Sequence, residues 1–100
     1  PMADPTTVGL FNPVSGRFYL KNTHSGGPAD VIIRVGPAGS NWIPITGDWD
    51  GDGDVTVGLF NPVSGRFYLK NTHSGGPADV IIRFGPAGSN WTPLAGDWTQ

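Results

Sequence analysis

Apolar residues along this chain cluster in segments of five or six residues, and turns rich in Gly, Pro, Asn and Ser separate these segments. In one such segment Phe67 and Leu69 alternate with residues that carry polar groups, which is the two-residue period of a strand with one apolar face. No segment has the 3.6-residue period of a helix. The pattern predicts an all-β chain, with strands in its second half at residues 56–60, 66–70, 79–84 and 91–95.

Two of these predicted strands differ from the others in composition. Residues 79–84 are the most apolar, so we expect them to form the most buried strand. Residues 91–95 include Pro93, which has no backbone N–H and therefore confines a strand to the edge of a sheet or to a bulge. We expect this fourth strand to lie at an edge.

The same pattern occurs twice, because residues 7–49 recur as residues 56–98 at an offset of 49 residues. Such near-identity favours a recent duplication or a designed, symmetrised sequence. The repeat divides the chain into a terminal segment at 1–6 with an expected expression scar, a first unit at 7–49, an acidic connection at 50–55, a second unit at 56–98 and a tail at 99–100. The aligned units differ only at the pairs Val35/Phe84, Ile43/Thr92, Ile45/Leu94 and Thr46/Ala95.

A unit of four antiparallel strands in about 40–50 residues has the size of one β-propeller blade. Propellers use about 4–8 blades, so a pair of blades leaves both outer faces uncovered. We therefore predict two blades per chain and a ring closed by homo-oligomerisation, as a homotrimer with six blades or a homotetramer with eight. A monomeric two-sheet sandwich and a fragment of a longer array are the alternatives.

Apolar strand positions are the residues that we expect to bury one blade against the next, within the chain and between chains. We also expect two tryptophans at matched positions to pack between blades, because an indole ring buries a large area. The predicted packing residues are Val57, Leu59, Phe67, Leu69, Val80, Ile82 and Phe84 with their first-unit equivalents, together with Trp49 and Trp98.

Four of the eight acidic residues lie within seven positions, between the two units. Carboxylates at alternate positions, followed by a Gly that permits a sharp turn, surround a hard cation with oxygen atoms and favour Ca²⁺. An EF-hand is excluded, because its twelfth position would be Leu59 instead of Glu and no helix flanks the loop. The alternative is an acidic turn that only connects two blades.

Residues 47–62, which read Gly-Asp-Trp, the acidic loop and then Val-Gly-Leu-Phe-Asn-Pro, resemble the repeats of integrin α-like (FG-GAP/VCBS-type) β-propellers. The resemblance implies that Asp48, Asp50 and Asp52 bind Ca²⁺ through their side chains and Asp54 through its backbone carbonyl. Thr56 stands where the family has its last Asp, which implies a weak site in the range of about 10⁻⁴–10⁻³ M. The resemblance also implies a secreted or cell-surface bacterial parent.

A second copy of this loop is incomplete, because the chain ends at residue 100 shortly after Asp97. If the chain ends meet across a ring, their junction holds only Asp97 and Asp4 as charged ligands. We therefore expect one metal loop within each chain, none at the junction between chains, and both chain ends at that junction.

Composition excludes several other functions. Six basic residues are spread evenly over the two units and the net charge is −2, which leaves no basic surface for nucleic acid. The chain has no Cys, so disulfides and thiolate metal sites are excluded. It has no targeting segment and no apolar stretch near the 18 residues of a membrane span, so we expect no membrane partner.

Two matched residue pairs suggest other functions. His24 and His73 each lie beside a Ser in a Gly-rich loop, but neighbouring loop residues do not supply the oriented base and nucleophile of an active site. We therefore predict no enzyme. Trp42 and Trp91 either pack between blades or stack on a carbohydrate, so a lectin-type propeller is the alternative function.

Overall fold

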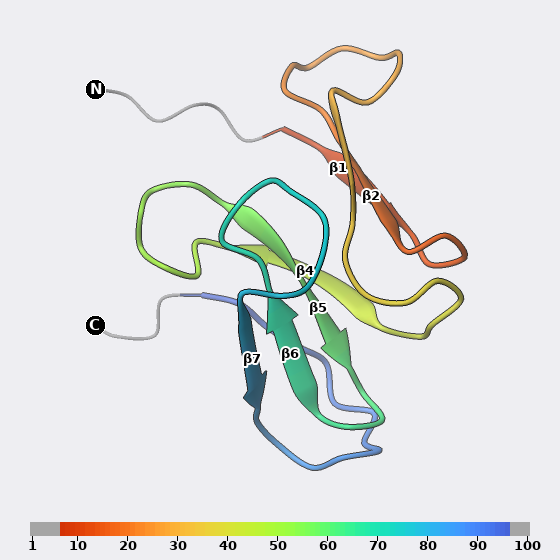
Figure 1. Ribbon diagram of the computed structural model, residues 1–100, viewed down its shortest axis with the longest axis vertical. Coiled ribbons are helices and arrows are strands. Elements are labelled where there is room, and N and C mark those ends of the chain that lie inside the picture. The colour runs from red at the N-terminus through yellow and green to blue at the C-terminus, as the bar shows by residue number, and fades with distance from the viewer. Residues whose placement is uncertain (1–6, 97–100) are drawn as a thin grey trace.

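The computed structural model describes residues 7–96, which form seven strands and no helix. The strands make two antiparallel sheets (Figure 1), which confirms the all-β class predicted from the sequence. The described part of the chain contains no helix that is long and apolar enough to cross a membrane. The first sheet has the order β1 (Gly9–Asn12), β2 (Arg17–Leu20), β3 (Val31–Arg34), and the second has the order β4 (Ile43–Gly47), β5 (Thr56–Asn61), β6 (Arg66–Leu69), β7 (Val80–Arg83).

Identical turns connect β1 to β2 and β5 to β6. In the second of these turns, the Asn61 side chain accepts the backbone N–H of Val63 at 3.0 Å. The backbone N–H of Gly65 donates to the Asn61 carbonyl at 2.8 Å, and Gly65 has a φ of 75°, which favours glycine. The Asn-Pro-Val-Ser-Gly segment therefore closes both hairpins, as its turn residues predict.

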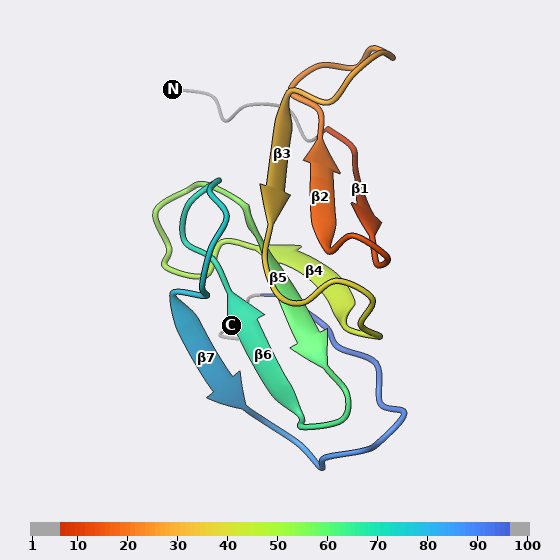
Figure 2. The ribbon, with the colours of Figure 1, turned by 45° about the vertical axis from the view of Figure 1, so that its right-hand side comes forward.

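The second sheet crosses the boundary between the two sequence units. Strand β4 comes from the first unit, yet it pairs with β5 of the second unit, with Pro44 opposite Leu59 and Thr46 opposite Val57. The acidic loop is therefore the connection of a β4–β5 hairpin within one sheet. Figure 2 shows the two sheets apart, with β1–β3 above β4–β7.

The strand that contains the repeated Pro behaves differently in the two units. In the first unit it is β4, an edge strand, which agrees with the position expected for Pro. In the second unit the expected strand at residues 91–95 is absent, and residues 91–96 have no regular secondary structure. The prediction of a strand there is wrong, because β4 pairs with the hairpin β5–β6, whereas residues 91–96 pair with no strand among the described residues.

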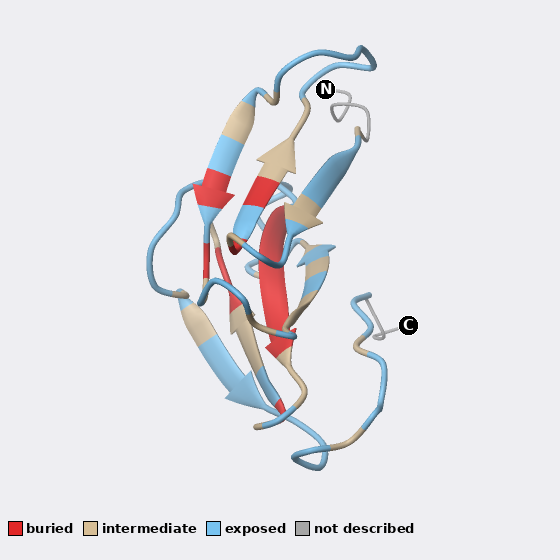
Figure 3. Ribbon diagram, turned by 90° about the vertical axis from the view of Figure 1, so that its right-hand side faces the viewer, coloured by how far each residue is buried: buried red, intermediate tan, exposed pale blue. Residues whose placement is uncertain are grey.

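The main core lies where the two sheets face each other, as the buried segments in Figure 3 show. Strand β5 is the most buried strand, whereas β7 is largely exposed. The expectation that residues 79–84 form the most buried strand is therefore wrong, because β7 is an edge strand and no other sheet of residues 7–96 lies next to it. The core cluster consists of Phe18, Ile33, Val35, Val57 and Leu59, with Phe11, Leu20, Val31 and Trp42 packed around it.

Gly36 makes the close approach of the two sheets possible. It lies after β3 with a φ of 81°, and a Cβ added there would lie 2.9 Å from Leu59 Cδ1 and 3.0 Å from the Trp42 ring. The repeated residue, Gly85, has no such close neighbour, since the nearest Trp91 ring atom is 3.8 Å from the equivalent position. The same sequence therefore has a filled environment in one unit and an open one in the other.

Candidate functional site

The acidic loop folds around the carboxylate of Asp48. This side chain accepts backbone N–H groups from Gly51 at 2.9 Å, Asp52 at 3.1 Å and Gly53 at 2.8 Å. Gly51 and Gly53 have φ values of 75° and 93°, so the turn depends on glycine at both positions. Asp48 thus shapes the loop through three hydrogen bonds that its sequence position alone does not reveal.

Three carboxylates come together in this loop. Oxygen atoms of Asp48, Asp50 and Asp52 all lie within 4.8 Å of one another, and the three residues are exposed. Asp50 accepts the Asp52 backbone N–H at 3.2 Å, and Asp52 accepts the Asp54 backbone N–H at 2.9 Å. Each carboxylate oxygen has two lone pairs, so these bonds leave acceptor sites open. Such a set of oxygen atoms could hold a metal ion.

The carboxylates of this loop affect one another's protonation. Partial removal from water is the largest cause of the raised pKa of Asp50, and the neighbouring charge of Asp52 raises it further. The pKa of Asp52 is lowered, mainly because its carboxylate accepts the backbone N–H of Asp54. A cation would relieve the repulsion that opposes ionisation of Asp50.

Two further ligands were predicted beside this group, the backbone carbonyl of Asp54 and Thr56. The carboxylate of Asp54 does not belong to the cluster of three, and its predicted contribution through the backbone carbonyl stays a prediction. Thr56 is buried, and its hydroxyl donates to the Lys70 carbonyl, so it is engaged on the sheet side of the loop. Asp97 and Asp4, which bear on the expected lack of a metal loop at the junction, lie outside the described residues.

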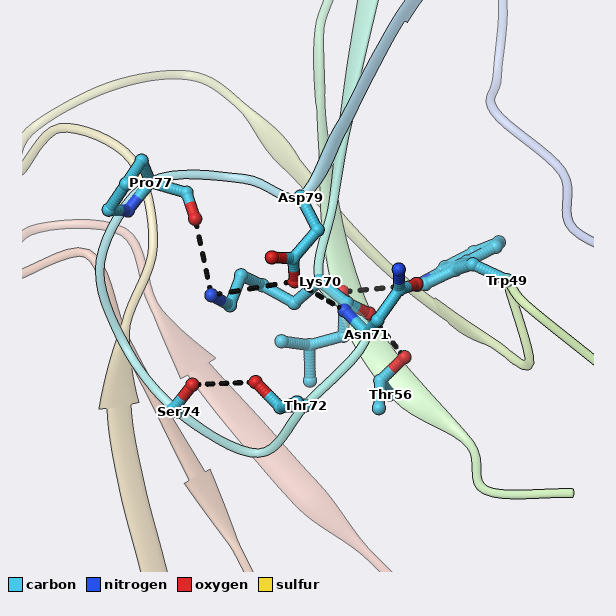
Figure 4. Close-up of polar contacts among 9 residues, drawn as sticks. Trp49, Thr56, Lys70, Asn71, Thr72, Ser74, Pro77 and Asp79 are labelled. Atoms are coloured by element: carbon cyan, nitrogen blue, oxygen red, sulfur yellow. Dashed lines mark hydrogen bonds and ion pairs between the residues drawn. The ribbon is translucent and has the colours of Figure 1, made fainter. Parts of the chain in front are cut away.

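A network that the sequence reasoning missed holds the loop at residues 71–79 (Figure 4). The buried Lys70 ammonium donates to the Pro77 carbonyl at 3.2 Å and lies 3.6 Å from the Asp79 carboxylate. Asp79 also accepts the backbone N–H of Asn71 at 2.7 Å. The first unit repeats this network around Lys21. A Lys and an Asp at the same spacing on either side of Gly-Gly-Pro in both units were the signal available in the sequence.

This loop also contacts the first sheet. The backbone N–H of Gly76 donates to the Arg34 carbonyl at the end of β3, at 3.1 Å. A Cβ at Gly75 would lie 2.9 Å from the same carbonyl oxygen, so only glycine fits there. The equivalent Gly26 of the first unit has nothing within 4 Å of the corresponding position.

The histidine-containing loops place each Ser hydroxyl against a Thr. The hydroxyls of Ser74 and Thr72 are 2.6 Å apart, and those of Ser25 and Thr23 are 2.7 Å apart. His73 is exposed beside this pair. Within residues 7–96 no hydrogen bond joins a His to a Ser.

The tryptophans occupy different environments. Trp42 stacks on Tyr68, with ring centroids 4.5 Å apart and an interplanar angle of 11°. The Trp49 indole N–H donates to the Val57 carbonyl at 3.2 Å. Trp91, the second-unit equivalent of Trp42, is 64% exposed. Trp98 lies outside the described residues.

The predicted packing residues separate into a covered set and an uncovered set. Val57 and Leu59 are 3% and 1% exposed, whereas their first-unit equivalents Val8 and Leu10 are 71% and 78% exposed. At the third strand of each unit the first-unit residues are buried and the second-unit residues are exposed. There the first-unit residues Ile33 and Val35 are 7% and 2% exposed, and their second-unit equivalents Ile82 and Phe84 are 48% and 76% exposed. Of the remaining positions, Leu69 is buried, and Phe67 and Val80 are half-buried.

These four comparisons define two surfaces. The N-terminal face contains Val8 and Leu10, and the C-terminal face contains Ile82 and Phe84. Inside the chain, the equivalents of these two faces contact each other in one core cluster.

No protein-family model, curated protein or solved structure matches the chain.

Proposed function

We propose that this chain is a self-assembling β-propeller scaffold without catalytic activity, in which identical chains associate head to tail into a closed ring. One observation carries the proposal: each residue of the two exposed faces has a repeat equivalent that is buried in the contact between the two sheets. The N-terminal face of one copy and the C-terminal face of the next therefore have the composition of a contact that already exists within the chain.

The two faces are different surfaces, so their contact is heterologous. A heterologous contact forms a ring if successive rotations close and an open filament if they do not. Propellers contain about 4–8 blades, so rings of two, three or four chains lie within the usual range, and the rings proposed for this chain have three or four chains. The angle between neighbouring sheets decides between these two numbers.

The energy of the contact indicates how much the apolar faces contribute. Full burial of a Val, Leu, Ile or Phe side chain contributes about 1.5–3 kcal/mol. Val8, Leu10, Ile82 and Phe84 are 48–78% exposed in the chain, so their burial contributes at most about 6–12 kcal/mol, which is similar to the cost of about 4–15 kcal/mol for the freedom lost on association. Additional contacts or ring closure must supply the remaining stabilisation.

Fusion of two copies into one chain tests the ring and its size. A ring of four chains predicts that the fused protein forms a closed dimer with the same mass as the original ring. A ring of three chains cannot be divided into fused pairs, so the fused protein would leave one pair of blades over and form larger species. Analytical ultracentrifugation separates these outcomes. A fused protein and a parent chain that both sediment as single monomers would contradict the proposal.

The proposal includes a weak Ca²⁺ site in the acidic loop, held by Asp48, Asp50 and Asp52. The proximity of their carboxylate oxygens supports it, and engagement of Thr56 on the sheet side supports a low affinity. Isothermal titration calorimetry should detect about one Ca²⁺ per chain, with a dissociation constant of about 10⁻⁴–10⁻³ M. Binding should be lost in Asp52→Asn and kept in Asp79→Asn, whose carboxylate lies in another loop. Equal binding by the two variants would contradict this assignment.

A carbohydrate-binding function is the second candidate, supported by an open groove beside Trp91. The polar residues Asn41, Ser89, Asn90 and Thr92 and the apolar residues Ile43, Pro62 and Val63 line this groove together with the exposed Trp91. Glycan-array binding that disappears in Trp91→Ala while the assembly persists would favour a lectin. Retained binding in that variant, or no binding by the parent chain, would contradict it.

A further inference from the structure

The first sheet has one strand fewer than the second. Its order is β1-β2-β3, against β4-β5-β6-β7 in the second sheet, so β1 is an edge strand where its equivalent β5 is an interior strand. Residues 92–96 are the second-unit equivalents of β4, and they have no regular structure. Within residues 7–96, no backbone hydrogen bond outside the strands involves residues 92–96. The described part of the chain thus contains one vacant strand position, beside β1, and one segment of strand length without a pairing partner, residues 92–96.

The β4–β5 pair inside the chain shows how such a segment binds. Shifting its register by the repeat offset of 49 residues places Pro93 opposite Leu10 and Ala95 opposite Val8. Lys70 donates its N–H to the Val57 carbonyl, and Lys21 donates in the same way to the Val8 carbonyl, both at 3.0 Å. Val8 therefore bonds toward β2, and in an antiparallel strand the alternate residues bond toward the opposite side.

This alternation leaves the backbone groups of Gly9 and Phe11 pointing to the free edge. Their partners in the shifted register are Leu94 and Thr92, which both have an N–H to donate. Pro93 falls at a position that does not bond across the new pair, so its missing N–H costs nothing there. The segment is therefore compatible with the vacant edge at every backbone position.

Two further contacts agree with the same placement. Trp42, just before β4, stacks on Tyr68 of β6, whereas the equivalent Trp91 is exposed and has no stacking partner among the described residues. The shifted register would place Trp91 on Tyr19. The Gly76–Arg34 backbone hydrogen bond likewise has a matching donor in Gly27 and acceptor in the Arg83 carbonyl.

We propose that residues 92–96 of one copy add to β1 of the next copy as its missing fourth strand, with Trp91 stacked on Tyr19 of that copy. This inference rests on the proposed head-to-tail assembly and identifies residues 92–96 as the segment of each chain that pairs with its neighbour. Every sheet of the assembly then contains four strands. Each first-unit sheet is built from two chains.

Single cysteine substitutions on separate chains test this pairing, because the chain has no Cys of its own. Val8 and Ala95 would form a pair without mutual backbone hydrogen bonds, which brings their Cα atoms to about 4.5 Å, within the range for a disulfide. Val8→Cys and Ala95→Cys chains, mixed and oxidised, should form disulfide-linked dimers of twice the chain mass. Each variant alone should form none.

Two controls match this experiment. Thr46→Cys with Val57→Cys in one chain occupies the equivalent pair inside the molecule, so it should give an intrachain disulfide and show that the geometry is suitable. Val8→Cys mixed with Leu94→Cys places the thiols on opposite faces of the pair, because neighbouring residues of a strand alternate in direction, and should link poorly.

The outcomes separate this inference from the proposed function. Assembly of the mixed Cys variants without Val8–Ala95 linkage would overturn the strand exchange and leave head-to-tail assembly intact. An intrachain disulfide in the double variant Val8→Cys/Ala95→Cys would also overturn it. A parent chain that stays monomeric at all concentrations would overturn both.

A proline pair gives a test that does not depend on thiols. Leu94→Pro removes an N–H that the shifted register requires, and it should weaken assembly by about tenfold or more, the value of one lost hydrogen bond. Ala95→Pro removes an N–H that points away from β1 and should leave assembly close to the parent level. Equal effects of the two substitutions on assembly would contradict the register.

Discussion

The matched leucines Leu59 and Leu10 distinguish a contact inside the chain from a contact between chains. Leu59 is 1% exposed in the core between the two sheets, and Leu10 is 78% exposed on the N-terminal face. The two residues have the same neighbours in sequence, since they lie in identical segments. Leu59→Ala and Leu10→Ala therefore make the same chemical change in two different environments.

The expected free-energy changes differ with the state of association. Replacing a buried Leu by Ala costs about 2–5 kcal/mol, a large part of the 5–15 kcal/mol that stabilises a typical domain. Leu59→Ala should therefore destabilise even the dissociated chain. Leu10→Ala should change the stability of the dissociated chain by less than about 0.5 kcal/mol, as expected for an exposed site. At each contact between chains it should cost the same 2–5 kcal/mol and weaken association by about 30-fold to a few thousand-fold.

Urea unfolding at several protein concentrations, combined with sedimentation, separates these effects. Leu10→Ala should retain the parent midpoint at the lowest concentration and lose assembly at concentrations where the parent is fully assembled. Leu59→Ala should lower the midpoint at every concentration. If Leu10→Ala assembled as tightly as the parent, the exposed N-terminal face would not be a contact surface and the reasoning would be refuted.

Three other predictions concern the glycines and acidic residues. Gly36→Ala should destabilise the chain by about 1–3 kcal/mol in urea unfolding, because the added methyl group clashes with the core. Gly85→Ala should destabilise the dissociated chain less, and it should impair assembly as measured by sedimentation. In EDTA at pH 7, Asp50→Asn should slightly raise the thermal midpoint in calorimetry. The pKa of Asp50 is raised in the folded chain, so ionisation of this carboxyl opposes folding at pH values above that pKa. The increase in the midpoint should therefore vanish near pH 3, where Asp50 is protonated. Asp79→Ala should cost about 1–2 kcal/mol in urea unfolding because it leaves a buried ammonium without its carboxylate, and Asp30→Ala, whose Lys partner is more exposed, should cost less. Equal losses in the last pair, or an Asp50→Asn midpoint shift that persists at pH 3, would contradict the stated causes.

Local features of the fold were predictable from the sequence. Alternation in residues 66–70 and the Asn-Pro-Val-Ser-Gly turns identify the hairpins, because strand period and turn chemistry act within a few residues. The Pro of the fourth strand indicated an edge position, and β4 lies at an edge. These properties depend on the backbone of the segment itself.

Burial was not predictable in the same way, because it depends on neighbours that the segment does not specify. The apolar run at 79–84 is largely exposed, whereas the nearly identical run ending at Val35 contributes to the core. A strand at residues 91–95 was also expected, but pairing needs a partner, and β4 pairs with the hairpin after it. Two nearly identical units therefore differ in structure through their position in the chain.

The candidate cation site was predictable in part. Alternating Asp residues place three carboxylates together, because a turn through two glycines at positive φ brings alternate side chains to one side. Thr56 was expected among the ligands, but its hydroxyl donates to the Lys70 carbonyl, a strand neighbour that spacing along the loop does not reveal. The Lys–Asp networks of the 71–79 and 22–30 loops were missed for the same reason.

Native mass spectrometry of the parent chain, with and without EDTA, tests head-to-tail assembly most directly. The account predicts one closed species of three or four times the 10.5 kDa chain mass. It also predicts about one Ca²⁺ per chain, lost on treatment with EDTA. A monomer of 10.5 kDa at all concentrations, or an open series of masses without a dominant closed species, would contradict it.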